Sequence, residues 1–254
     1  MDSSEIGRES ETPGEDEPVF RYSQALDRPV IRDVFKRFRR VHVPDFLSPE
    51  SARRLHACLV NDVPWSLAYF DGEKAADVNA GENAALGHAE RRDLEDKIAA
   101  QAHRGFAYIY ESFRVDDEAA RKLYPNLYLQ RFVDYLNSAE FLSFIRAVTG
   151  LSRIAFADAQ ATRYRSGHFL TRHDDDVAGK NRLAAYVLNL TPDWRADYGG
   201  NLLFLGPDGH VEEAYVPRFN ALNIFAVPKG HAVSIVAPFA KNARYSVTGW
   251  LRAR

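Results

Sequence analysis

The feature that most constrains the fold is a series of short strand patterns that begins near residue 154 and continues almost to the end of the chain. Apolar, β-branched and aromatic segments alternate there with turn signals such as Gly206-Pro207-Asp208-Gly209 and Pro228-Lys229-Gly230. Short strands at such spacing are typical of a β-sandwich or barrel. The predicted strands cover residues 154–165, 167–174, 182–190, 200–205, 210–216, 219–226, 231–237 and 244–252.

The first half of the chain shows helical patterns instead. Ser48, followed by Pro49 and Glu50, has the composition of a helix start. Apolar residues around 141–148 recur at helical spacing and stop at Gly150. Helices are predicted over residues 48–63, 89–103 and 141–148. The fold class we predict is therefore mainly β with a helical layer: a double-stranded β-helix (jelly-roll) core of about eight strands, buttressed by N-terminal helices.

The chain shows no internal boundary between independent domains. Residues 1–18 are rich in Ser, Glu, Asp, Pro and Gly and are predicted to form a disordered acidic tail. Residues 19–254 are expected to form a single domain. Within it, residues 19–153 would give mainly helical support and residues 154–252 the jelly-roll core.

Composition and charge exclude several function classes. The 254 residues include 33 Lys and Arg against 35 Asp and Glu, so a broad basic surface for nucleic acid is absent. No apolar run approaches the roughly 18 residues of a membrane helix, and the acidic N-terminus lacks the features of a signal peptide. The single cysteine, Cys58, excludes an intrachain disulfide and thiolate-rich zinc sites. We expect a cytoplasmic protein with no nucleic-acid or membrane partner; its oligomeric state stays open.

A polar cluster at residues 172–176 is the first candidate site. If residues 173–175 continue a strand, a side-chain period of two places His173 and Asp175 on one face and Asp174 on the other. An imidazole and a carboxylate would then point to one place, although a solvated turn is the alternative. By itself the pair supplies only two metal ligands.

A third ligand must come from elsewhere in the sequence, and His231 is the best placed. It opens an apolar strand directly after the turn at residues 228–230. Two histidines and one carboxylate, with open positions opposite, form the triad of non-haem Fe(II) oxygenases. A purely structural role for His231 is the alternative.

The last predicted strand carries a polar row on one face. Arg244, Ser246, Thr248 and Trp250 alternate with apolar or small residues, so they share the face that points into the core. A buried arginine is costly unless an anion pairs with it. That anion is either an acid of the protein or a ligand carboxylate, which matches the two-pronged guanidinium. Tyr164, on the strand before His173, is a further donor to the same carboxylate.

With these residues in order, the sequence resembles the Fe(II)/2-oxoglutarate-dependent dioxygenase superfamily. The ordered set His173-x-Asp175, His231 and Arg244-x-Ser246 carries the resemblance. Tyr164-x-x-Gly167, the stretch RLAAYVLNL and Gly199-Gly200-Asn201-Leu202 make it similar to the prolyl-hydroxylase branch, in particular to the catalytic domain of ribosomal-protein prolyl hydroxylases. Residues 154–252 resemble it well, and the helical half loosely.

The resemblance implies a catalytic role and cofactors. His173, Asp175 and His231 would bind Fe(II). Arg244 would hold the far carboxylate of 2-oxoglutarate, with help from Tyr164 and Ser246. The reaction would use O2, release succinate and CO2, hydroxylate a C–H bond of a prolyl residue in a protein or peptide, and take ascorbate as activator.

The sequence departs from the family at two points. Many relatives carry tyrosine where this chain has Asn189, so Asn189 is expected to contact the cosubstrate in an altered way. The ribosomal-protein enzymes carry a further C-terminal domain, whereas this chain ends at Arg254, so their substrate is not carried over. The resemblance also suggests a lid at residues 71–87, which the sequence predicts to be a mobile loop. Arg163, Arg165 and Arg172 are expected at the solvated rim of the site.

Two alternatives stay open. One is a hydroxylase of a free amino acid or another small metabolite. The other, from a different class, is a jelly-roll binding or sensor module without turnover; the presence of both a metal triad and a carboxylate clamp argues against it.

Overall fold

The structure of the chain is a computed structural model that describes residues 19–254, so the predicted tail at residues 1–18 lies outside the described part. The helices are α1 Arg28–Phe38, α2 Pro49–Asn61, α3 Ala80–Ala85, α4 His88–Arg104, α5 Glu118–Leu123, α6 Tyr128–Leu136 and α7 Ala139–Thr149. The strands are β1 Arg40–Val43, β2 Ser66–Phe70, β3 Ala75–Val78, β4 Tyr108–Phe113, β5 Phe156–Ala157, β6 Gln160–Tyr164, β7 Phe169–His173, β8 Arg182–Asn189, β9 Leu202–Leu205, β10 Val211–Tyr215, β11 Ala221–Ala226, β12 His231–Val233 and β13 Arg244–Arg252. In this part of the chain, no helix combines the length and the apolar character needed to cross a membrane.

The three predicted helices correspond to α2, α4 and α7, whereas α1, α3, α5 and α6 were not predicted. Ser48 caps α2 by accepting a hydrogen bond from the backbone N–H of Ser51, and Pro49 occupies the first turn. At the other end of the helical half, α7 stops at Gly150, which adopts φ +71°. Glycine reaches this left-handed conformation without the steric cost that a Cβ would add.

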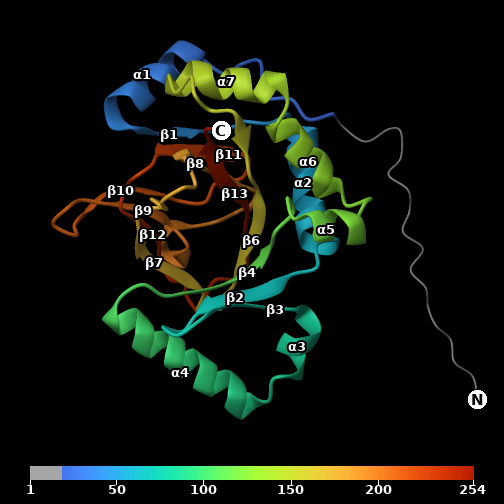
Figure 1. Cartoon of the computed structure of the whole chain (residues 1–254), viewed down its shortest axis with the longest axis vertical. Coiled ribbons are helices and arrows are strands. Elements are labelled where there is room, and N and C mark those ends of the chain that lie inside the picture. The colour runs from blue at the N-terminus through green and yellow to red at the C-terminus, as the bar shows by residue number, and fades with distance from the viewer. Residues whose placement is uncertain (1–18) are drawn as a thin grey trace, which may run out of the picture.

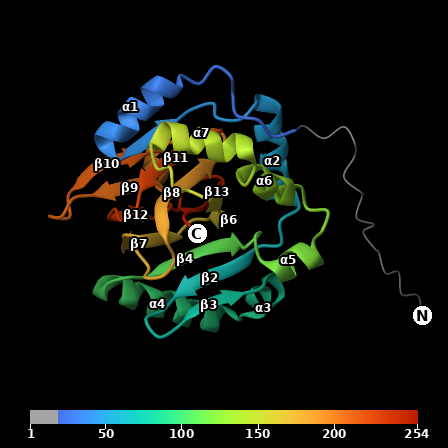
Figure 2. The same ribbon diagram turned by 45° about the horizontal axis from the view of Figure 1, so that its top comes forward.

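The strands form a nearly closed antiparallel barrel. Their order is β1-β11-β8-β13-β6-β4-β7-β12-β9-β10, with β2 and β3 added beside β4 and β5 beside β13. The two strands at the ends of this order also approach each other, because Arg40 on β1 forms an ion pair with Glu213 on β10 at 2.5 Å. The predicted jelly-roll core is confirmed, and Figure 2 shows its strands lying between α1 and α7 on one side and α4 on the other.

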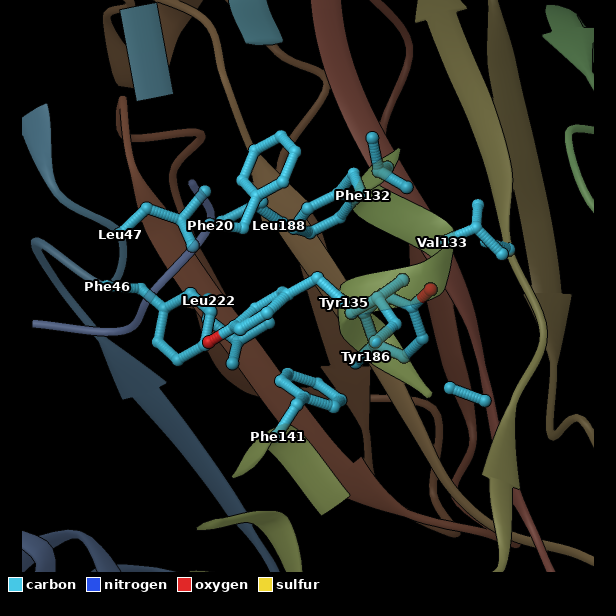
Figure 3. Close-up of a cluster of buried hydrophobic side chains, with 14 of the residues drawn as sticks. Phe20, Phe46, Leu47, Phe132, Val133, Tyr135, Phe141, Tyr186, Leu188 and Leu222 are labelled. Atoms are coloured by element: carbon cyan, nitrogen blue, oxygen red, sulfur yellow. The ribbon is translucent and has the colours of Figure 1, made fainter. Parts of the chain in front are cut away.

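Four helices cover the outer face of the barrel that is formed by β8, β11 and β13. Helices α1 and α7 lie together above the barrel and α2 and α6 beside it (Figure 1). Their apolar side chains join those of β8, β11 and β13 in one buried core. Figure 3 shows part of it, with Phe46 and Phe141 from the helical half beside Tyr186 and Leu222 from the barrel. Burial of such side chains contributes about 1.5–3 kcal/mol each.

The remaining long helix packs elsewhere. Helix α4 lies on the opposite side of the molecule, below β2 and β3 in Figure 1. Its Ile98 is buried with Leu67 and Tyr69 of β2 in a small separate cluster. This packing covers β2, which pairs with β4 of the barrel.

Three expectations about the elements were wrong in part. The first half contains β1–β4 as well as helices, so it is less uniformly helical than predicted. Residues 71–87, predicted as a mobile loop, contain β3 and the capped helix α3. The predicted strand 154–165 divides into β5 and β6 because Asp158 turns its carboxylate to the backbone N–H of Trp250 between them.

Candidate active site

A cavity of about 390 Å³ lies inside the barrel. Its wall has a polar end on β6 and β13 and a histidine-rich part on β7 and β12. Aromatic residues of β4 and the segment before it complete one side. The lining side chains that bear on chemistry are Phe106, Tyr108, Tyr110, Gln160, Thr162, Tyr164, His173, Asp175, Arg182, His231, Arg244, Ser246, Thr248 and Trp250.

The three predicted metal ligands meet in this cavity. His173 ends β7 and His231 opens β12, and the two residues are direct partners in the antiparallel pair. Asp175 Oδ1 lies 3.6 Å from His173 Nε2, and Asp175 Oδ2 lies 3.4 Å from His231 Nε2. One donor atom from each residue fits within 4.8 Å of the others. Their spacing suits a divalent ion that takes nitrogen and oxygen ligands.

The backbone orients both imidazoles for this purpose. His173 Nδ1 lies 3.0 Å from the carbonyl of Thr171, and His231 Nδ1 lies 2.7 Å from the carbonyl of Lys229. A ring that donates from Nδ1 to a carbonyl leaves the lone pair of Nε2 free for a metal. Burial, followed by the neighbouring His173, lowers the pKa of His231, which favours the neutral, ligating form.

Asp175 reaches the site by a route that strand alternation did not predict. Strand β7 ends at His173, and Asp175 has φ +66°, a left-handed conformation uncommon outside glycine. The side chain of Asp175 is nevertheless only 8% exposed, whereas Asp174 and Asp176 are exposed at the cavity mouth. His173 and Asp175 therefore share the cavity as expected, but a turn and not a continuous strand brings them together.

The polar end of the cavity is built around Arg244. This residue is 2% exposed and is the register partner of Tyr164, over whose ring its guanidinium lies at 5.0 Å. Among residues 19–254, no acid pairs with Arg244, and its Nε has no hydrogen-bond partner. Its Nη2 donates only a long bond of 3.4 Å to Asn189 Oδ1. A buried cation left in this way fits an anionic ligand.

The residues beside Arg244 at the polar end of the cavity are uncharged. Burial raises the pKa of Tyr164 well above its usual value, so its phenol stays a neutral donor. Ser246 Oγ lies 2.8 Å from Thr162 Oγ1. Ser246 is the register partner of both Thr162 and Asn189. Of the predicted residues, Tyr164, Arg244 and Ser246 line the cavity, and Asn189 contacts it through Arg244.

Several lining residues were missed from the sequence. Phe106, Tyr108 and Tyr110 come from the half that was predicted to be helical, although the alternating stretch YIYESF carries a strand signal. Arg182 lines the cavity from the start of β8, where its guanidinium lies 3.5 Å from the centre of the Trp250 ring. Nothing in the sequence marks Arg182 apart from other charged residues near a turn.

Two further expectations need correction. Arg163 and Arg165 do not form a free solvated rim, because both donate to Glu111, at 2.5 and 2.8 Å. Arg163 and Glu111 are mostly buried; Arg165 and Arg172 are exposed. Residues 71–87 contribute no side chain to the cavity wall.

Comparison with known proteins shows what the barrel is similar to. Residues 159–252 match the 2OG-Fe(II) oxygenase superfamily. A mouse protein described as prolyl 3-hydroxylase OGFOD1 is 25% identical over 163 residues, which are 61% of this chain and 29% of that protein. The chain thus spans less than a third of the length of this relative.

Solved structures agree on the fold. A Pseudomonas putida prolyl-4-hydroxylase superposes with a TM-score of 0.55 at 19% identity, covering 92% of this chain and 98% of that one. A Trichoplax adhaerens prolyl hydroxylase, solved with a peptide fragment of hypoxia inducible factor, also gives 0.55, at 17% identity, with 89% of each chain covered.

Proposed function

We propose that this chain, whose residues 159–252 match the 2OG-Fe(II) oxygenase superfamily, is an Fe(II)- and 2-oxoglutarate-dependent dioxygenase that hydroxylates a prolyl residue in a protein or peptide. The observation that carries the proposal is the joint presence, in one cavity, of the His173–Asp175–His231 cluster and a buried arginine that no acid of the described residues pairs with. Either feature alone has a structural explanation. Together they match a metal and a dicarboxylate.

In this proposal His173, Asp175 and His231 hold Fe(II) through two Nε2 atoms and a carboxylate oxygen. Arg244 holds the distal carboxylate of 2-oxoglutarate, with Tyr164 as a second donor. When bound, the iron and its cosubstrate supply, with O2, the oxidative decarboxylation to succinate and CO2 that drives hydroxylation of a C–H bond. Two observations support this fit: Arg244 Nε has no hydrogen-bond partner among residues 19–254, and the Nε2 atoms of both histidines face the Asp175 carboxylate.

The protein contributes orientation and exclusion of water. The carbonyls of Thr171 and Lys229 fix the histidine rings, and the register of β6 and β13 fixes Tyr164 beside Arg244. Between the two ends, apolar side chains such as Leu170 and Val233 line the cavity. A dry wall of this kind strengthens the charged hydrogen bonds at both ends.

Ser246 and Asn189 are proposed to support the clamp. Among the described residues, the Arg244 side chain donates a hydrogen bond only to Asn189 Oδ1. Asn189 therefore orients the guanidinium in place of a tyrosine hydroxyl. Ser246, paired with Thr162, offers a hydroxyl near the same ligand. We also propose that residues 19–254 act as one unit, since the main core includes side chains from both halves.

The prolyl substrate rests on the likeness to proteins described as prolyl hydroxylases, one of them solved with a peptide. The mouth of the cavity is bordered by exposed residues, among them Phe106 and Val177, which leaves room for a chain to approach. A free amino acid or small metabolite is the competing substrate class.

The test measures succinate formed from 2-oxoglutarate with Fe(II) and ascorbate, for the wild type and for His173→Ala, with prolyl peptides and with free proline. We expect peptide-dependent turnover in the wild type and none in the variant. Mass spectrometry should find one added oxygen atom on the peptide. Hydroxylation of free proline alone would contradict the peptide substrate. Undiminished turnover in His173→Ala and Asp175→Ala would contradict the metal site.

A further inference from the structure

The carboxylate of the metal cluster lies on an unusual piece of backbone. Asp175 follows the end of β7 and adopts φ +66°, whereas the two histidines of the cluster lie within paired strands. For a residue with a Cβ, this conformation is costly and persists only where surrounding contacts enforce it. Asp adopts this conformation more readily than most residues, and contacts near Asp175 can stabilise the turn further.

Two bonds to the neighbouring Asp174 help, one from the N–H of Lys229 to its carbonyl and one from the N–H of Asp176 to its Oδ1. The contact made directly to Asp175 comes from the side chain of Arg182. Its Nη1 donates a hydrogen bond of 3.0 Å to the backbone carbonyl of Asp175 and lies 3.9 Å from Asp175 Oδ1. The guanidinium is itself fixed, because its Cζ lies over the Trp250 ring, 3.5 Å from the ring centre, and the side chain is only 15% exposed. Arg182 also opens β8, which pairs with β13, so the contact joins the turn to the most extensively paired part of the barrel.

We propose that Arg182 is a positioning residue that locks the turn at Asp175 and so sets the carboxylate in register with His173 and His231 for metal binding. The inference rests on the proposed function, since it assumes that this cluster holds a divalent metal. Arg182 acts through Asp175, in the way that hydrogen-bond partners of ligands tune other metal sites.

Charge alone predicts the opposite effect, which makes the proposal testable. A guanidinium 3.9 Å from a ligand oxygen repels a divalent cation bound to that oxygen. Neutral replacement of Arg182 would then tighten metal binding. If Arg182 acts by positioning, the same replacement weakens metal binding.

Arg252 supplies a matched control. It is the register partner of Arg182, and its Nε donates a 2.7 Å bond to the carbonyl of Lys180, in the same loop as Asp175. Its side chain also forms a 3.5 Å ion pair with Asp158 and lies over the ring of Phe156 at 4.9 Å, and neither residue lines the cavity. Arg252→Met therefore removes a guanidinium that is bonded to the same loop but does not contact Asp175.

The experiment measures Co(II) binding to the metal-free protein by calorimetry, without cosubstrate or peptide. It compares the wild type with Arg182→Met, Arg182→Lys and Arg252→Met. We expect Arg182→Met to bind Co(II) ~10–100-fold more weakly and Arg252→Met to bind as the wild type does. Arg182→Lys keeps the charge but not the planar fork, so it should also bind more weakly than the wild type. The visible absorption bands of bound Co(II) should change in both Arg182 variants and not in the control.

Equal or tighter Co(II) binding by Arg182→Met would overturn the positioning role. Thermal unfolding of the metal-free variants shows whether they are folded. If Arg182→Met is not folded, Arg182→Lys decides the question: wild-type Co(II) affinity and spectrum in that variant would overturn the proposal. A folded wild-type protein that binds no Co(II) would refute the metal site itself, and the proposed function and this inference would fall together. Tight wild-type binding with unchanged variants refutes only the inference.

Discussion

Arg244 offers a prediction in which ligand binding and stability change in opposite directions. Arg244→Met removes the guanidinium but keeps a side chain of similar length in the cavity wall. Two charge-assisted hydrogen bonds to a carboxylate are worth about 3 kcal/mol together. At 1.4 kcal/mol per factor of ten, the affinity for 2-oxoglutarate should fall roughly 100-fold.

Without ligand, the same substitution should not harm the fold. The guanidinium is 2% exposed with no acid partner in the described part of the chain, and an uncompensated buried cation costs several kcal/mol in desolvation. Its loss forfeits the contact with the Tyr164 ring, worth about 0.5–2 kcal/mol, and a long bond to Asn189. We expect the free energy of unfolding of the metal-free variant to be unchanged or about 1 kcal/mol higher, the latter raising Tm by about 2–4 °C.

The two effects separate in one assay, thermal unfolding of the anaerobic, metal-loaded protein with and without 2-oxoglutarate. At a concentration 100 times Kd, the wild type gains about 2.7 kcal/mol from the ligand. A variant that binds 100-fold more weakly gains only about 0.4 kcal/mol at that concentration. Calorimetric titration with 2-oxoglutarate measures the affinity directly.

Arg163→Met is the mirror control. Arg163 lies next to Tyr164 on β6 but pairs with the buried Glu111 at 2.5 Å, outside the cavity. Its replacement should lower the free energy of unfolding and leave the affinity for 2-oxoglutarate unchanged. If Arg244→Met instead destabilised the metal-free protein and kept full affinity, Arg244 would be a structural residue and the carboxylate clamp would be wrong.

Two further predictions concern carboxylates. Asp175→Ala should abolish turnover, whereas Asp174→Ala should retain most of it. In the described part of the chain, the exposed Asp174 side chain accepts a hydrogen bond only from the N–H of Asp176. Equal losses of activity in the succinate assay would show that the wrong carboxylate was assigned. Burial opposes ionisation of Glu111, but hydrogen bonds from Arg163 and Arg165 outweigh it and hold the pKa of Glu111 below its ordinary value. A depressed carboxyl pKa stabilises the fold fully above the unfolded value and progressively less as the pH falls through the folded one. The stability difference between wild type and Glu111→Gln in urea should therefore be constant near neutral pH and shrink below about pH 4; a difference that grows on acidification would show that Glu111 is buried in its protonated form.

The barrel could be predicted from the sequence because its signals are local. Period-two patterns and turn residues located the strands of the second half, and the row Arg244, Ser246, Thr248 and Trp250 lines the cavity as expected. His173 and His231 were found as candidates because each lies at the end of a predicted strand, and the family resemblance placed them in one metal cluster. What the sequence leaves out is pairing between distant segments, such as Glu111 opposite Arg163. For that reason β4 and its tyrosines were missed as cavity residues.

Asp175 shows how a correct residue can be found for an incomplete reason. Strand alternation predicted that it shares a face with His173, yet the strand stops at His173 and a left-handed turn returns the carboxylate to the site. That turn depends on Arg182, which lies on β8 and outside the pattern at residues 173–175, and on Trp250, against which Arg182 packs. Local patterns cannot predict such a conformation, because a side chain from another strand stabilises it.

The two faces of β13 explain why the helical half matters for a site to which it contributes few residues. On the inner face, Arg244 and Ser246 are polar and buried, an arrangement that costs stability without a ligand. On the outer face, Val247 and Leu251 are fully buried in the main core against the helices, and Tyr245 packs at its edge. Because both faces belong to one backbone, the apolar packing outside offsets the polar burial inside. The helices thus hold β13 in place when the cavity is empty, and the clamp is formed before its ligand arrives.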